Sequence, residues 1–344
     1  MVNQTATMTI VPKREFWIDL LRAFACVMVL FCHSPQPYHG QAGQWLMPVT
    51  NYFGMAWGPI LFFMISGACI MNKELEAVPF LRRRFSRILI PTIFWSIVYV
   101  IIECMVWHTC PEQDLWKKII MIPFEPQYGL MWFMYALIAI YLMTPILSRW
   151  LHRCGQSECR LYITLWGITL LLPYADLLGI DIESIINSNG TLFYFSGFLW
   201  MAVLGYYCRQ YGQILCFRWW YVLVCIIILM SPMYIFIIKI NTGITVASSL
   251  SVDAVATTVL AFIFFRNLKW KGGIISKAIE LLSKYSFGIY LTHMLLMYPF
   301  RMWIAQFNFH YFIQIPLTVL VVGLFAFSFT SLLSKIPFSK YIIG

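Results

Sequence analysis

Long apolar segments recur along the whole chain and restrict it to a fold that is embedded in a membrane. Hydrophobic residues make up 61% of the 344 residues, and charged residues make up only 11%. Soluble domains carry about 25% charged residues, so this chain has too little charge to cover a surface that faces water. Its apolar runs are continuous, whereas the strands of a membrane β-barrel alternate. We therefore expect an all-α, polytopic membrane helical bundle.

A helix that crosses a bilayer needs about 20 apolar residues, and the chain offers about ten such segments. The expected spans are 15–34, 52–72, 87–107, 129–149, 160–175, 192–208, 219–239, 249–266, 285–304 and 313–334. Span 160–175 is the shortest and weakest. We expect the whole chain, 1–344, to form a single integral membrane domain.

The basic residues predict the orientation of these spans. If the N-terminus is cytoplasmic, the outside holds four cations: Lys117, Lys118, Lys239 and Arg301. The inside then holds nineteen: Lys13, Arg14, Lys73, Arg82, Arg83, Arg84, Arg87, Arg149, Arg153, Arg160, Arg209, Arg218, Arg266, Lys269, Lys271, Lys277, Lys284, Lys335 and Lys340. Such a bias favours ten spans with both termini cytoplasmic. It also explains the net charge of +10 without a nucleic-acid partner, and it attracts anionic lipids or ligands.

Three ionisable residues lie in the first span. Arg22 and His33 are eleven positions apart, which is three helical turns plus about 20°, so they share a face and are separated by about 16 Å of rise. Asp19 lies close to that face and is the expected counter-charge of Arg22. Because ionisable groups in hydrocarbon cost at least about 2.5 kcal/mol each, they are typically paired or functional. The alternative is structural: an Asp–Arg pair at the inner interface and a histidine that merely ends the helix.

Four arginines, Arg82, Arg83, Arg84 and Arg87, lie between the second and third spans. Guanidinium groups bind phosphate in a bidentate manner, so the cluster is a candidate anion site at the cytoplasmic surface. The alternative is a positive-inside anchor on anionic lipid, which by itself is the more common reason for such a run.

A stripe of polar side chains runs along the first half of the ninth expected span, 285–304, and begins two residues before it. Ser283, Ser286, Tyr290 and His293 recur at spacings of three and four, so they share one face of an apolar helix. We expect His293 to lie about 13 Å above the inner surface. The stripe is either part of a site or a set of hydrogen bonds that joins helices.

The ten cysteines indicate no metal or redox site, because none has CxxC spacing. Cys104 and Cys110 flank the start of an expected external loop and are able to pair. No metal ligands are expected in this chain.

Several of these motifs occur together, in order, in a known family. Ile18–Arg22 followed by His33 matches an Arg-x10-His signature, Leu61–Gly67 matches FFxxSG, Arg82–Arg87 matches a basic loop, and Ser286–His293 matches SxxIYLxH. The chain thus resembles the acyltransferase family 3 integral membrane acyltransferases, and in particular their short members without a soluble esterase-like domain. It departs from them at Leu20 and Ala23, where glycine is frequent, and around Trp132, where an expected histidine is absent.

The resemblance implies transfer of an acyl group, most often acetyl, from cytoplasmic acyl-CoA to a cell-surface or lipid-linked glycan. It implies His33 as general base, Arg22 and Asp19 as its catalytic partners, and a continuous interior passage from the arginines to His33. The acetyl-CoA phosphates would bind Arg82, Arg83, Arg84 and Arg87. The supporting residues would be Ser66, Trp132, Ser286, Tyr290 and His293.

Two other functions remain open from the sequence. One is a polysaccharide exporter or flippase with the same membrane fold. The other is a haem-binding electron carrier that uses His33 and His293, which is disfavoured because their expected depths differ by about 12 Å. The resemblance further implies the bacterial cytoplasmic (inner) membrane as location and membrane lipids as partners. It leaves the oligomeric state open, with a homo-oligomer among the options.

Overall fold

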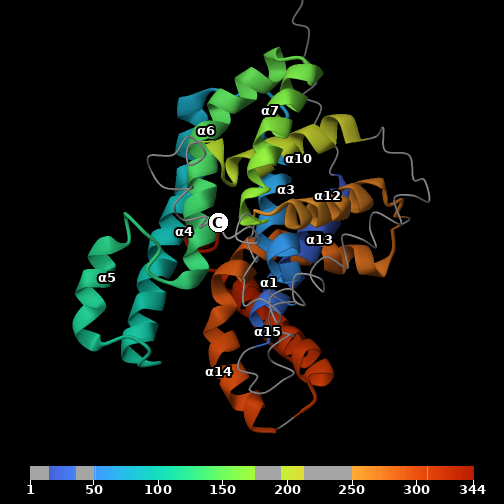
Figure 1. Cartoon of the computed structure of the whole chain (residues 1–344). Coiled ribbons are helices and arrows are strands. Elements are labelled where there is room, and N and C mark those ends of the chain that lie inside the picture. Colours follow the sequence, from blue (N-terminus) through green and yellow to red (C-terminus); the bar gives the residue numbers. More distant parts are fainter. Residues whose placement is uncertain are drawn as a thin grey trace, which may run out of the picture.

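The computed structural model describes residues 15–35, 50, 52–174, 195–212, 250–270, 272–307 and 309–344. In this part of the chain every regular element is a helix. The α-helices are α1 (Phe16–His33), α3 (Leu61–Ile70), α4 (Ala77–Met105), α5 (Leu115–Met121), α6 (Trp132–Arg153), α7 (Gln156–Thr169), α10 (Leu199–Tyr211), α12 (Val252–Asn267), α13 (Ile274–Thr292), α14 (Met294–Ile304) and α15 (Tyr311–Leu333). Figure 1 shows α1, α3 and α13 in the middle, α4, α5 and α6 on the left, and α14 with α15 at the lower end.

Five helices in the described residues are long and apolar enough to cross a membrane. They are Phe16–His33, Tyr52–Ile70, Ala77–Met105, Gly129–Arg153 and Tyr311–Leu333. These helices agree with the predicted spans 15–34, 52–72, 87–107, 129–149 and 313–334.

Four more predicted spans, 160–175, 192–208, 249–266 and 285–304, fall on α7, α10, α12 and the pair α13–α14. Span 219–239 lies outside the described residues. The count of ten spans and the cytoplasmic position of both termini therefore stay predictions.

Two helices begin much earlier than the sequence predicted. α4 begins at Ala77 rather than near residue 87, and α13 begins at Ile274 rather than near residue 285. Apolarity marks only the part of a helix that lies in hydrocarbon, whereas backbone hydrogen bonding continues through polar turns beyond it. The arginine cluster consequently lies on the first turns of α4 and not in a loop, which corrects the predicted basic loop.

Helix α1 lies at the centre of the bundle and contacts α3, α12, α13 and α15. Leu21, Ala25 and Val29 are buried on it. Polar contacts join it to α13: Ser283 Oγ donates to Asp19 Oδ1 at 2.7 Å, and Cys26 Sγ lies 4.0 Å from the Ser286 carbonyl oxygen. Hydrogen bonds between helices stabilise bundles in a solvent that cannot supply them.

The closest helix crossing joins α3 and α10 and depends on two glycines. A Cβ added at Gly67 would lie 1.8 Å from the Ala202 carbonyl oxygen, and one at Gly205 would lie 2.0 Å from that of Met64. Small residues of this kind let two membrane helices approach until their backbones touch. The crossing fixes α3, whose other faces line the candidate site.

Candidate functional site

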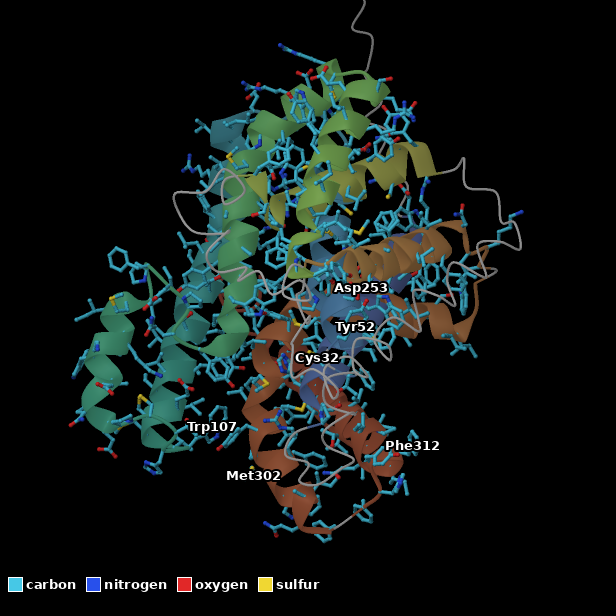
Figure 2. The ribbon with its side chains drawn as sticks, in the orientation of Figure 1. Cys32, Tyr52, Trp107, Asp253, Met302 and Phe312 are labelled. Atoms are coloured by element: carbon cyan, nitrogen blue, oxygen red, sulfur yellow. The ribbon has the colours of Figure 1, made fainter. Side chains whose placement is uncertain are left out.

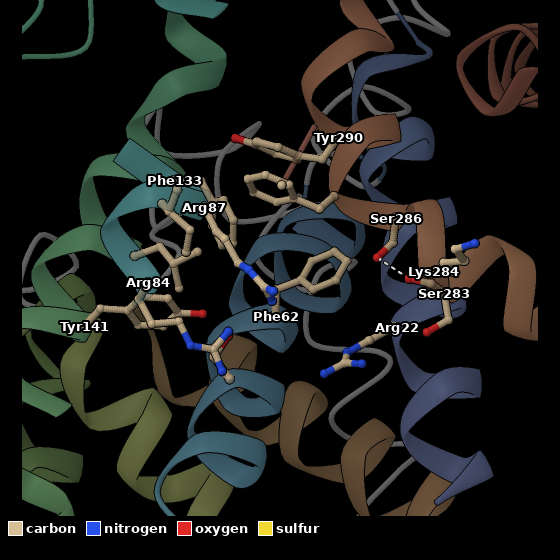
Figure 3. A pocket seen from close by; sticks show the side chains of 15 residues that line it. Arg22, Phe62, Arg84, Arg87, Phe133, Tyr141, Ser283, Lys284, Ser286 and Tyr290 are labelled. Atoms are coloured by element: carbon tan, nitrogen blue, oxygen red, sulfur yellow. Dashed lines mark hydrogen bonds between the residues drawn. The ribbon is translucent and has the colours of Figure 1, made fainter. Parts of the chain in front are cut away.

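A cavity of about 320 Å³ opens among α1, α3, α4, α6 and α13. Four cations line it: Arg22 from α1, Arg84 and Arg87 from α4, and Lys284 from α13. Figure 3 shows the three guanidinium groups turned toward the same space. Five aromatic side chains also line it: Phe62, Phe133, Tyr141, Phe287 and Tyr290. A long ligand with an anionic end and a less polar arm would fit this division.

Two of the four clustered arginines on α4 line the cavity. Arg84 and Arg87, three positions apart, face the cavity, and the Arg84 guanidinium carbon lies 5.7 Å from the Tyr141 ring centroid. Arg82 and Arg83 are exposed and do not line the cavity. Of the four arginines predicted as an anion site, only Arg84 and Arg87 therefore line the cavity. Arg82 points about 140° away from Arg87 around the helix axis, and Arg83 lies one turn before Arg87, closer to the start of α4.

A second pocket, of about 390 Å³, adjoins the first at the end of α1 that begins with Phe16. It shares Arg22, Ser283 and Lys284 with the cavity and adds Glu15, Ile18, Asp19 and Cys69. Arg22 therefore lies where the two spaces meet, so a ligand that extends through both would pass its guanidinium group.

Asp19 and Arg22 contact different neighbours. Asp19 accepts the hydrogen bond from Ser283, whereas Arg22 Nη2 donates to Cys69 Sγ at 3.5 Å. The two side chains are three residues apart and diverge by about 60° around the helix axis, one toward α13 and the other toward α3. The expected direct Asp19–Arg22 salt bridge is thus replaced by these contacts, although both residues line the same pocket.

The predicted stripe on α13 faces the cavity for most of its length. Ser283, Ser286 and Tyr290 line it, and Ser286 Oγ donates to the Ser283 carbonyl oxygen at 2.8 Å (Figure 3). The Tyr290 hydroxyl donates to the Leu130 carbonyl oxygen.

Of the two remaining supporting residues, only one is near this space. Ser66 on α3 lines the cavity. Trp132 does not; its ring packs 5.3 Å from that of Phe198 and 6.3 Å from that of Phe63. The next residue, Phe133, takes the place at the cavity wall.

His33 and His293 are neighbours, with ring centroids 5.4 Å apart. The expected 12 Å difference in depth is therefore wrong. That expectation placed Lys284 at the inner surface. Ser283 instead hydrogen-bonds Asp19, which lies one turn inside α1, so this part of α13 lies deeper in the bundle than expected. α1 and α13 pack directly against each other, which leaves no space for a porphyrin between these two rings and removes the haem alternative.

The contacts of His293 determine which of its nitrogens carries a proton. Nδ1 lies 2.7 Å from the Tyr290 carbonyl oxygen and 3.2 Å from that of Ile289. Carbonyl oxygens only accept, so Nδ1 must be the donor. In the neutral ring Nε2 then carries a lone pair, and it is buried without a hydrogen-bond partner in the described structure.

Arg301 on α14 is a site residue that the sequence analysis assigned to the outer surface. Its side chain is buried, at 7% exposure, and Nη1 donates to the His33 carbonyl oxygen at 2.6 Å. Figure 2 shows the adjacent Met302 on the outer side of α14, whereas Cys32, beside His33, lies in the interior. One signal was available: Arg301 lies inside predicted span 285–304, where a charge indicates function.

The cavity does not reach the two histidines, because the side chain of Tyr290 lies between them and the cavity. Neither His33 nor His293 lines it; Tyr290 does, and its ring centroid lies 6.1 Å from that of His293. Phe133, 5.1 Å from Tyr290 by ring centroids, completes this barrier. The continuous passage implied by the sequence resemblance is therefore interrupted here by two aromatic side chains.

Comparison with protein families gives one match. A family model described as an acyltransferase domain matches residues 15–335, which include the histidine pair, Arg301 and every residue that lines the cavity except Gly344. No curated protein and no solved structure matches the chain.

Proposed function

We propose that this chain, which belongs to acyltransferase family 3 and is thus a membrane acyltransferase, acetylates a hydroxyl of a cell-surface or lipid-linked glycan. The proposed donor is acetyl-CoA. The observation that carries the proposal is the arrangement of one cationic cavity and one histidine pair on opposite sides of Tyr290. The first suits a nucleotide thioester, and the second suits proton transfer.

The donor binds from the cytoplasmic side. The phosphates of CoA would contact Arg84, Arg87 and Lys284, and the pantetheine arm would extend past Arg22 and Ser286 toward Tyr290. Bidentate contacts of guanidinium with phosphate supply both affinity and orientation. A donor held at its distant end loses freedom before the reaction, which lowers the barrier for the transfer step.

His33 acts as general base. A sugar hydroxyl is a weak nucleophile until its proton is removed, and a neutral imidazole accepts that proton near pH 7. The oxygen then attacks the thioester carbonyl carbon, the ester forms, and the carbon–sulfur bond breaks. The proton on His33 passes to the departing thiolate, so that CoA leaves as a thiol. Asp19 has no direct role in this step, since it hydrogen-bonds Ser283 near the opposite end of α1.

The reaction requires that Tyr290 or Phe133 move. Both side chains separate the end of the cavity from the histidines, and an extended thioester has to pass them to reach His33. Rotation of an aromatic side chain is a small motion compared with a helix displacement. We infer that donor binding promotes it.

The finer assignment follows from the resemblance of the sequence to short family members. The acetyltransferase of enterobacterial common antigen is the type of enzyme that this chain resembles, so a bacterial envelope glycan is the acceptor we propose and the inner membrane is the location. Acetyl-CoA is the corresponding donor.

The test is mass spectrometry of lipid-linked and surface glycans from cells that lack the gene and carry either the wild type or His33→Ala. We expect acetyl groups with the wild type and at least about a 100-fold loss with His33→Ala. His310→Asn is a matched control, because His310 is exposed and Asn preserves its capping of α15. Unchanged acetyl content with His33→Ala would contradict the proposal, and loss of the polymer itself would favour an exporter.

A further inference from the structure

Arg301 presents a buried positive charge beside the residue that acts as base. Among the described residues, its guanidinium group makes one hydrogen bond, from Nη1 to the His33 carbonyl oxygen, and its Nε is buried without a partner. Helix α1 ends at His33, so this carbonyl lies at the negative end of the helix dipole. The contact fixes the guanidinium group and the imidazole of His33 to the same helix end.

No carboxylate neutralises this charge within the described residues. The salt bridges there join Lys118 to Glu103, Arg153 to Glu74 and Arg209 to Glu15. The groups that interact electrostatically with Arg301 are the phenols Tyr128 and Tyr298 and the two imidazoles. A buried cation without a counter-charge is expensive, so its retention points to an anion that is present only at one stage of the reaction.

The proposed transfer produces such an anion. When the hydroxyl oxygen attacks, the electron pair of the carbonyl bond moves to the carbonyl oxygen and gives a tetrahedral oxyanion. It forms within a few ångströms of His33, because the base must contact the attacking hydroxyl. Hydrogen-bond donors that are fixed before the reaction stabilise an oxyanion most effectively.

Two other donors near this point, on Tyr290 and His293, are already engaged. The Tyr290 hydroxyl donates to the Leu130 carbonyl oxygen. The Nδ1 proton of His293 is directed to the carbonyl oxygens of Ile289 and Tyr290, and Nε2 of the neutral ring accepts rather than donates. Arg301 is the residue of this group that keeps a free donor.

We infer that Arg301 is a catalytic residue that stabilises the oxyanion of the acyl transfer, while His33 removes the proton. The inference rests on the proposed function. The backbone carbonyl of His33 anchors Arg301, which stabilises the oxyanion, while the side chain of His33 removes the proton from the acceptor.

The test is steady-state kinetics of the purified full chain in lipid nanodiscs, with acetyl-CoA as donor. The acceptor probe is envelope glycan extracted from cells that lack the gene. We expect Arg301→Gln to lower kcat by about 100-fold to 1,000-fold, the usual effect of one lost oxyanion donor, with the KM for acetyl-CoA unchanged. Arg301→Lys, which keeps the charge in a different geometry, should give an intermediate kcat. Arg149→Gln, at an exposed arginine on α6, is the matched control.

The outcomes separate this inference from the proposed function. No transfer by the wild type, or full transfer by His33→Ala, would contradict the proposed function itself. Transfer that depends on His33 but proceeds within threefold of the wild-type rate in Arg301→Gln would overturn the role of Arg301. A rise in the KM for the acceptor with unchanged kcat would also overturn it, because Arg301 would then bind a permanent anion of the glycan. If Arg301→Gln does not fold, the kcat of Arg301→Lys provides the test instead. A wild-type kcat in Arg301→Lys would then overturn the inference.

Discussion

Arg84 and Arg87 differ from Arg82 and Arg83 in their position on α4 and not in their chemistry. The first pair lines the cavity and the second does not, although Arg87 is exposed like Arg82 and Arg83. All four have the same charge and the same long-range attraction for an anion or for anionic lipid. The proposed donor site therefore depends on which positions of α4 border the cavity, and Arg82 with Arg83 provides a control of equal charge.

The double variant Arg84→Gln/Arg87→Gln should raise the KM for acetyl-CoA by about 10-fold to 100-fold. Glutamine keeps an amide donor at each position, so the expected net loss is that of about one hydrogen bond to a charged group, about 1.5–3 kcal/mol. The control Arg82→Gln/Arg83→Gln removes the same charge from the exposed face and should change the KM less than about threefold. Equal effects of the two double variants would show that net charge, and not the cavity, attracts the donor.

The spacing of residues on a helix predicted His33, Arg22 and the α13 stripe as candidates, and the family resemblance added Ser66. Arg301 was missed, because its role depends on α14 folding against the end of α1, and no local pattern encodes that contact. The Asp19–Arg22 pair was predicted for the opposite reason: helical spacing makes it possible, but Ser283 from a distant segment binds Asp19 instead.

At the scale of elements, the crossing of α3 and α10 supports the site without contributing a reactive group. Gly67 should not tolerate a side chain, because the Cβ of Gly67→Ala would meet the Ala202 carbonyl oxygen. Overpacking against backbone costs about 3 kcal/mol of unfolding free energy. The expected result is a lower melting temperature in detergent and less protein in the membrane.

Gly167→Ala on α7 is the matched control, since nothing lies within 4 Å of the added Cβ. It should leave the melting temperature unchanged or raise it, because alanine favours a helix over glycine. If Gly67→Ala is as stable as Gly167→Ala, the close backbone contact of α3 with α10 is not as described.

The sequence predicted where the membrane helices lie along the chain, but it did not predict how long they are. Hydropathy located the apolar centres of α1, α4, α6 and α15, because lipid demands about 20 apolar residues. It did not show that α4 and α13 continue through polar turns, and those turns place Arg84 and Lys284 at the cavity. A window of hydrophobicity carries no information on residues that leave the bilayer within the same helix.

At the scale of the whole molecule, the proposal requires that the cavity opens to the cytoplasm and that the histidines face the outside. Cys104 and Cys110 test this orientation. Both are free, buried thiols in the structure, and they contact each other beside Val100 near the end of α4. This region is expected outside, where compartments are oxidising.

We expect the two thiols to form a disulfide in protein from intact cells. Mass spectrometry after alkylation without reductant should show neither thiol modified, and both modified after reduction. Cys154 and Cys159, which are predicted to lie on the cytoplasmic side, serve as internal controls and should be alkylated without reductant once the protein is denatured. Free Cys104 and Cys110 in unreduced protein would argue against the orientation.

The central claim is that donor bound among the arginines reaches His33 and Arg301 past Tyr290. The most direct measurement is a cryo-electron microscopy structure of the His33→Ala protein with acetyl-CoA. The account predicts phosphates beside Arg84, Arg87 and Lys284, a displaced Tyr290 or Phe133 side chain, and the acetyl carbonyl between position 33 and Arg301. An acetyl group that stops on the cavity side of an unmoved Tyr290 would contradict it.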